Sequence, residues 1–155
     1  MLKKSITLIA LFVSVYLTGC ASVPMDSAVT DKAKKEFLAP SDGKSGLYIY
    51  RNSSFGAALK KTVSIDGEII GESARNTYFY KEVEPGTHEL STESEFSDNK
   101  LSLEFQKGVN YFVQQYIKFG AFVGGAALKA VTEEEGKKGV LECNLAKPNA
   151  SLSAK

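Results

Sequence analysis

The first residues form a short positive start followed by an apolar run, and this pattern limits the folded protein to the part that follows. Lys3 and Lys4 precede an apolar stretch over residues 6–17, which two polar residues interrupt. A helix that spans a bilayer needs about 20 apolar residues, so this stretch is too short to span one. A charged start, a short apolar run and small residues at its end are typical of a secretory signal peptide. The sequence therefore predicts export and removal of residues 1–19.

The end of the run departs from an ordinary signal peptide. Leu17, Thr18, Gly19 and Cys20 resemble the lipobox of bacterial lipoproteins at all four positions. The resemblance implies that a signal peptidase recognises Leu17, Thr18 and Gly19 and cuts before Cys20. It also implies a diacylglycerol on the Cys20 thiol and an N-acyl chain on the new amino terminus. Because each buried CH₂ contributes about 0.8 kcal/mol, two or three such chains would anchor the protein permanently.

Residue 21 bears on the final location. In the enterobacterial lipoproteins that this chain resembles, an aspartate after the lipidated cysteine retains the protein in the inner membrane. Ala21 stands there instead. The resemblance therefore implies outer-membrane sorting in a Gram-negative host, with the domain facing the periplasm. The expected partners are the membrane, through the lipid anchor, and the lipoprotein-processing and sorting machinery.

Charge and cysteine content exclude several classes of function. The whole chain carries a net charge of +1, and the predicted signal peptide removes Lys3 and Lys4, so no basic excess remains to attract nucleic acid. If Cys20 carries lipid, Cys143 has no partner for an intramolecular disulfide. One histidine, His88, and one cysteine are too few for a structural zinc site. We also find no nucleophile–base pair, so we predict no catalytic residue, no metal, no cofactor besides the lipid, and no enzymatic activity.

The mature chain divides into three parts by composition. Residues 20–45 contain Pro24, Pro40, small polar residues and mixed charges, which predicts a flexible lipid-anchored tether that reaches about 25 Å. Residues 46–146 carry the alternating apolar pattern of a β domain. Residues 147–155 are polar, and we expect a disordered tail.

Short strands are the main elements expected within the domain. Alternating β-branched and aromatic residues predict strands over residues 47–51, 77–83, 88–96, 101–106, 111–119 and 141–145. Thr132 and Glu135 have the spacing of a capping box, which predicts a short helix before Gly139. About seven evenly spaced strands predict a mainly β fold, an antiparallel β-sandwich with a short helix near the C-terminus.

A hairpin over residues 60–72 is the best-defined local element. Asp66-Gly67 favours a type I′ turn, because both central residues of that turn need positive φ. The register that this turn sets places Val63 opposite Ile70 and Ser64 opposite Ile69.

The hairpin and the segment after it also resemble known families. Two stretches carry the first resemblance: Val63-Ser64-Ile65-Asp66-Gly67-Glu68-Ile69-Ile70-Gly71 and Val83-Glu84-Pro85-Gly86-Thr87-His88-Glu89-Leu90. Together they are similar to the IDG…IG…PG-x-H pattern of PEGA-type surface domains, which are small prealbumin-like sandwiches. Over a longer span the chain resembles an uncharacterised family of proteobacterial lipoproteins, a domain of unknown function. The shared features are Phe37, Pro40, Gly43, residues 47–51, the hairpin and residues 111–113. That family has no established activity, so the resemblance implies fold and location only.

Four tyrosines are the candidate ligand or partner surface. Tyr48 and Tyr50 alternate on one predicted strand, and Tyr78 and Tyr80 alternate on another. They form either an aromatic platform for a glycan or a partner protein, or the second layer of the sandwich, since aromatic residues are common in strands.

Three further features have two interpretations each. His88 is either a ligand or pH-sensitive contact, or a strand-edge histidine bonded to backbone. Cys143 is either a redox thiol or a core residue, and its alternation with Leu141 and Leu145 favours the core. The glycine-rich segment 120–131 either contacts a membrane or partner, or forms a buried crossover.

These observations lead to one preferred function and two alternatives. The preferred function is an outer-membrane-anchored periplasmic lipoprotein whose domain is a non-catalytic binding or scaffolding module of the cell envelope. The first alternative is a lipoprotein that binds peptidoglycan or another glycan through its tyrosine-rich sheet face. The second, an enzyme, would require polar groups that converge in a pocket.

Overall fold

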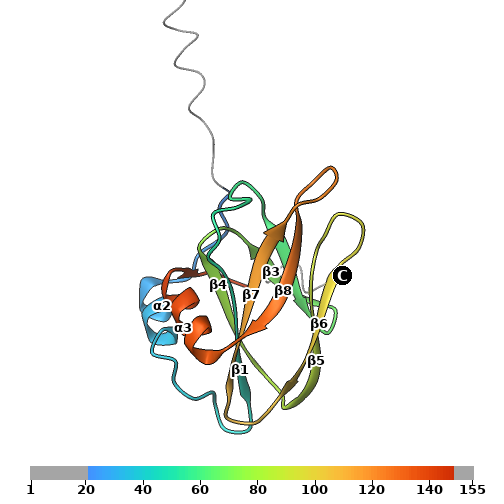
Figure 1. Ribbon diagram of the computed structural model, residues 1–155. Helices are drawn as coiled ribbons and strands as arrows, with labels where there is room; N and C mark the ends of the chain where they lie inside the picture. The colour runs from blue at the N-terminus through green and yellow to red at the C-terminus, as the bar shows by residue number, and fades with distance from the viewer. Residues whose placement is uncertain (1–20, 149–155) are drawn as a thin grey trace, which may run out of the picture.

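The computed structural model describes residues 21–148, which form two packed β-sheets with helices on one side (Figure 1). Within these residues nine strands lie in two sheets, and one short helix, α3 (Glu133–Leu141), follows near the C-terminus. The predicted mainly β sandwich with a C-terminal helix is thereby confirmed. The predictions for the signal peptide, the lipobox and Cys20 lie outside the described residues, as does most of the predicted tail.

The two sheets contain five and four strands. The first has the order β8-β7-β1-β4-β9 and consists of β1 (Ser45–Arg51), β4 (Thr77–Val83), β7 (Asn110–Lys118), β8 (Gly125–Val131) and β9 (Asn144–Leu145). The second has the order β3-β2-β5-β6 and consists of β2 (Lys61–Ile65), β3 (Glu68–Ser73), β5 (Gly86–Thr92) and β6 (Asn99–Phe105). The pairs β1–β7 and β4–β9 are parallel, so the first sheet is mixed rather than purely antiparallel.

The core lies between the sheets and follows the predicted alternation. Leu47 and Ile49 of β1 face inward beside Phe79 of β4, and Leu90 of β5 meets them from the second sheet; all four are almost fully buried. Burial of each such side chain contributes about 1.5–3 kcal/mol to folding. The other face of β1 carries Tyr48 and Tyr50, which belong to a separate cluster outside this core.

The hairpin β2–β3 has the predicted turn and a partly different register. Asp66 and Gly67 have φ values of 50° and 81°, as a type I′ turn requires. Ser64 pairs with Ile69 as predicted, but Val63 pairs with Gly71, because the register shifts between Val63 and Ser64. This irregularity is a β-bulge, which places one extra residue on one strand.

Residues 21–45 are packed on the domain, so the prediction of a flexible tether is wrong for them. Val23 is buried in the core, and Met25 forms a β-bridge with Ala146. Helix α2 (Ala28–Lys34) begins at Ser27, whose hydroxyl accepts from the Thr30 amide. The backbone amide of Leu145 donates to the Asp31 carboxylate at 2.9 Å, which ties the helix to β9. These contacts join residues that lie far apart in the sequence, so the local composition of the segment does not predict them.

The C-terminal region differs from prediction in two places. The expected strand over residues 141–145 is reduced to β9, because α3 continues to Leu141 and leaves that side chain exposed. The segment 120–131 is not the single buried crossover that one interpretation predicted. Residues 125–131 form β8 against β7, while Phe122 in the preceding loop is 90% exposed.

None of the helices over residues 21–148 combines the length and hydropathy needed to cross a membrane.

Candidate functional site

Helix α3 lies unusually close to the outer face of the first sheet, and two glycines make this possible. A Cβ atom on Gly136 would lie 2.2 Å from Cβ of Phe112, and one on Gly139 would lie 2.1 Å from Cε2 of Tyr50. Real side chains never approach so closely, so only glycine fits at these positions. The predicted capping box is present at the start of the helix, where the Thr132 hydroxyl accepts from the Glu135 amide.

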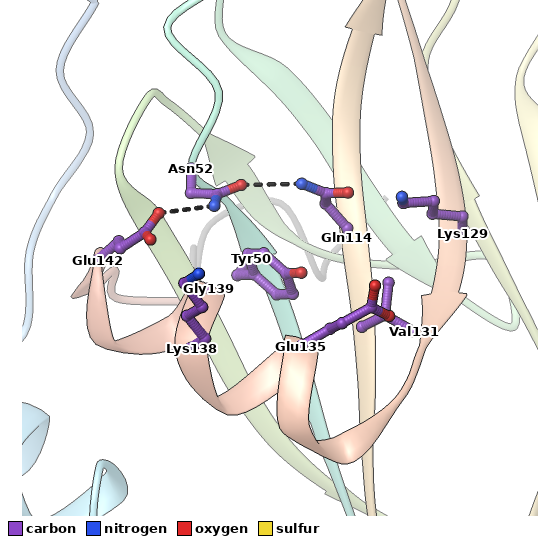
Figure 2. Close-up of a pocket in the computed structure, with 9 residues that line it drawn as sticks. All are labelled: Tyr50, Asn52, Gln114, Lys129, Val131, Glu135, Lys138, Gly139 and Glu142. Atoms are coloured by element: carbon purple, nitrogen blue, oxygen red, sulfur yellow. Dashed lines mark hydrogen bonds between the residues drawn. The ribbon is translucent and has the colours of Figure 1, made fainter.

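A polar groove of about 340 Å³ lies between α3 and the strands β1, β7 and β8 (Figure 2). Its walls come from three stretches that are separated in sequence: the end of β1, the middle of β7, and β8 with the helix α3 that follows it. The lining residues are Tyr50, Asn52, Gln114, Lys129, Val131, Glu135, Lys138, Gly139 and Glu142.

A chain of hydrogen bonds crosses one end of this groove (Figure 2). The side-chain amide of Gln114 donates to Oδ1 of Asn52 at 2.9 Å, and Nδ2 of Asn52 donates to Oε2 of Glu142 at 2.8 Å. The chain connects β7, the residue after β1 and the C-cap of α3. Figure 2 shows the remaining oxygen of the Gln114 amide directed toward Lys129. An amide offers donors and an acceptor at once, so this end of the groove suits a ligand with several polar groups.

The groove carries charges of both signs around one phenol. Lys129 and Lys138 contribute positive charge, Glu135 and Glu142 contribute negative charge, and Tyr50 lies at the floor (Figure 2). Burial, followed by the two carboxylates and Cys143, raises the pKa of Tyr50 above its ordinary value of 10. The phenol therefore stays protonated and uncharged at neutral pH. The described side chains that line the groove include no histidine, serine or cysteine.

The four predicted tyrosines share one sheet face, as the sequence indicates, but three of them are covered. Tyr48, Tyr50 and Tyr78 are only 1%, 3% and 0% exposed, and Tyr80 is half-buried. Of the two interpretations of these tyrosines, the open aromatic platform is wrong for these three rings, which instead form a second layer beneath α2 and α3.

Hydrogen bonds to α2 fix this second layer. The hydroxyl of Tyr48 donates to the Lys34 carbonyl at 2.9 Å, and that of Tyr78 donates to the Asp31 carbonyl at 3.3 Å. Burial, and secondarily Glu82, raises the pKa of Tyr48 to about 12. The segment predicted as a tether thus supplies the cover that removes the tyrosines from solvent.

His88 is bonded to both a backbone carbonyl and a carboxylate. Its Nδ1 lies 2.5 Å from Oδ2 of Asp66, and its Nε2 lies 2.9 Å from the Glu84 carbonyl. The carboxylate hydrogen bond is the main cause of a raised His88 pKa, and the same bond lowers the pKa of Asp66. The contact with backbone is the one predicted for a strand-edge histidine, whereas the contact with Asp66, a residue predicted only to form the turn, was not predicted.

Cys143 is a core residue, as its alternation with Leu145 indicates. It is 1% exposed and belongs to the cluster around Tyr50 and Val140. Burial raises the pKa of its thiol to about 12, so almost none of it is thiolate at neutral pH. Over residues 21–148 we find no group of three or more His, Cys, Asp or Glu side chains able to hold a metal ion.

Comparison with known proteins places the chain in a family. A family model described as a protein of unknown function, DUF2846, matches residues 41–126, more than half of the chain. An uncharacterized protein of Haemophilus influenzae (strain ATCC 51907 / DSM 11121 / KW20 / Rd) is 52% identical over 134 residues, which cover 86% of this chain and 80% of that protein. No solved structure matches. The chain therefore belongs to the DUF2846 family of proteins of unknown function.

Proposed function

We propose that the protein is an outer-membrane-anchored periplasmic lipoprotein whose domain is a non-catalytic binding or scaffolding module of the cell envelope. The observation that carries this proposal is that the folded domain begins directly after the predicted lipidation site. The Ala21 amide donates to the Ala57 carbonyl at 3.4 Å, and Val23 is already in the core. Acyl chains on Cys20 would therefore hold the domain at the membrane surface without a spacer.

The groove beside α3 is the surface that we assign to binding. Its volume of about 340 Å³ falls within the range of small-ligand sites. Its lining is polar and carries both signs of charge, which suits a peptide loop or a glycan better than an apolar molecule.

A second candidate function makes the same groove a peptidoglycan site. The observation that favours it is the pair of side-chain amides, Asn52 and Gln114, next to Lys129. Amides and charged groups can bond the hydroxyl, amide and carboxylate groups of a peptide-bearing glycan. This version of the glycan hypothesis rests on the groove and not on the buried tyrosine rings.

Co-sedimentation of the protein with purified sacculi separates the two candidates. If the groove binds peptidoglycan, Lys129→Ala will lower the bound fraction, whereas Lys107→Ala, at an exposed lysine outside the groove, will leave it unchanged. Equal binding of the two variants would contradict a glycan site in the groove.

The anchoring itself is tested by Cys20→Ala. The variant lacks the thiol to which the diacylglycerol is attached, so we expect an uncut precursor in the inner-membrane fraction. The intact mass of the wild-type protein should exceed that of the cut polypeptide by the acyl groups. A Cys20→Ala protein that is cut and sorted normally would refute the lipoprotein proposal.

A further inference from the structure

Large apolar side chains are exposed together at one end of the sandwich. They lie in the loops 52–60, 93–98 and 119–124, each of which joins two strands at that end (Figure 1). We call this set the phenylalanine end. It consists of Phe55, Phe96, Phe119, Phe122 and Val123, which are 45%, 81%, 88%, 90% and 54% exposed. Single exposed apolar residues are normal on a protein surface, but a contiguous group indicates an interaction site.

The three loops are in contact with one another. The rings of Phe55 and Phe119 lie 4.7 Å apart, centroid to centroid. The carboxylate of Glu95 accepts hydrogen bonds from the backbone amides of residues 121–123, with distances of 2.6 Å to Ala121 and 3.1 Å to Val123. One side chain from loop 93–98 thus fixes the tip of loop 119–124.

A buried arginine fixes the remaining loop. Arg51 is 0% exposed and donates to the carbonyls of Leu59 at 2.8 Å and Gly56 at 2.5 Å. A buried charged group is costly unless it is hydrogen-bonded, and the two carbonyls of loop 52–60 supply such bonds to Arg51. Polar supports on both sides therefore hold the phenylalanine end in a conformation that points its apolar side chains outward.

The chain enters the domain at this same end. Ala21 is hydrogen-bonded to Ala57 in loop 52–60, and Figure 1 shows the described chain beginning beside that loop. Because consecutive Cα atoms are about 3.8 Å apart, a lipid on the residue that precedes Ala21 would be attached beside this loop. The proposed anchor would therefore act at the same end of the domain as the exposed phenylalanines.

We infer that the phenylalanine end lies against the phospholipid bilayer, with Phe119, Phe122 and Val123 inserted at the boundary between headgroups and acyl chains. The inference rests on the proposed lipid anchor, which brings this end and no other to the membrane. Phenylalanine is among the residues that lie at this boundary, at a depth of about 5–10 Å in surface-bound proteins. The acyl chains hold the domain on the membrane, and the aromatic side chains set its orientation.

Tryptophan fluorescence tests this orientation, because the chain contains no tryptophan. The full-length protein is expressed with Phe122→Trp, purified from membranes and reconstituted in phosphatidylcholine vesicles. Leu38→Trp is the control. Leu38 is 68% exposed, and its carbonyl accepts from Asn110 at the start of β7, at the opposite end of the sandwich. The vesicles are prepared with and without phosphatidylcholine that is brominated along its acyl chains.

For Phe122→Trp we expect emission at shorter wavelength in vesicles and a loss of intensity with brominated lipid. For Leu38→Trp we expect the emission of a water-exposed indole and no quenching. Absence of quenching in Phe122→Trp overturns the inference. A shift to shorter wavelength without quenching overturns it as well, because it indicates that another protein copy covers this end.

The intact mass of the same sample distinguishes failure of the inference from failure of the proposed function. If the protein carries acyl chains and Phe122→Trp is not quenched, the orientation is wrong and the lipoprotein proposal stands. If the protein carries no acyl chains, both are wrong, since the anchor is the premise of the orientation.

Discussion

His88 of β5 and Asp66 of the β2–β3 turn are joined by one short contact. Nδ1 of the imidazole lies 2.5 Å from Oδ2 of the carboxylate, whose other oxygen accepts from the Glu89 amide at 2.9 Å. Asp66 is a central residue of the β2–β3 turn, while His88 belongs to β5, which follows the β4–β5 turn at Glu84. The pair therefore links the hairpin to the neighbouring strand through a titratable bond.

The stability that this pair provides should depend on pH. The pKa of His88 is raised above 6.5, so its contribution is complete below the unfolded-state pKa and is lost as the pH rises through the folded-state pKa. The pKa of Asp66 is lowered below 3.8, so its contribution is lost as the pH falls through that lower value. Because Asp66 is half exposed, we expect His88→Gln to cost less than about 1 kcal/mol between these limits.

Urea unfolding of the wild type and His88→Gln across this pH range measures the effect. The difference in unfolding free energy should shrink at alkaline pH. Lys100→Gln is the control, because the exposed Lys100–Glu89 pair joins β6 to β5 and has no histidine. A difference for His88→Gln that is the same at every pH would show that the charge of His88 makes no contribution.

Gly139→Ala should destabilise the domain. The added Cβ would lie 2.1 Å from Tyr50, which is buried and cannot turn away, so α3 must move off the sheet. Overpacking of this kind costs about 1–3 kcal/mol, which exceeds the gain of up to about 1 kcal/mol in helix propensity. Thermal unfolding followed by circular dichroism measures the loss.

Glu134→Ala is the matched control for this substitution, because Glu134 is an exposed residue of the same helix. Its effect should stay within about 0.5 kcal/mol. If Gly139→Ala were as stable as Glu134→Ala, the close approach of α3 to Tyr50 would not be required by the fold.

Cys143 should resist alkylation in the folded protein. Its thiol is 1% exposed and its pKa is raised to about 12, so iodoacetamide has neither access nor thiolate at neutral pH. The chain has two cysteines, and an acylated Cys20 would leave Cys143 as the reactive one once urea unfolds the domain. Mass spectrometry after labelling with and without urea measures the alkylation of Cys143 in the unfolded and in the folded protein. Rapid labelling without urea would disagree with a core position.

Local patterns predicted the strands that alternate strongly, and they missed those that depend on distant contacts. The alternation of Leu101, Leu103 and Phe105 and the Asp66-Gly67 turn are properties of short segments, and both are observed. By contrast, β8 begins with Gly125-Ala126-Ala127, which are buried but too small to give a strong apolar alternation. The register shift at Val63 and the parallel pairing of β1 with β7 also arise from tertiary packing.

The candidate site was less predictable than the fold. The shared face of the tyrosines follows from strand alternation, but their burial depends on α2 and α3. Helix α2 is held by bonds such as that from Tyr48 to the Lys34 carbonyl, and Gly139 of α3 packs on Tyr50. The groove draws Asn52, Gln114 and Glu142 from three separated parts of the chain. None of these residues belongs to a motif, so only the folded arrangement brings them together.

The residues that line the groove should contact the bound partner in the cell. Lys129 is exposed and lines the groove, so a photo-reactive amino acid at this position should form an adduct with the bound partner. A discrete protein adduct would support the scaffolding function and allow the partner to be identified by mass spectrometry. A heavy adduct that collapses under muramidase would support the peptidoglycan function instead. The same probe at Lys107, exposed and outside the groove, should give neither product. Equal adducts at the two positions, or none at Lys129, would contradict the assignment of binding to the groove.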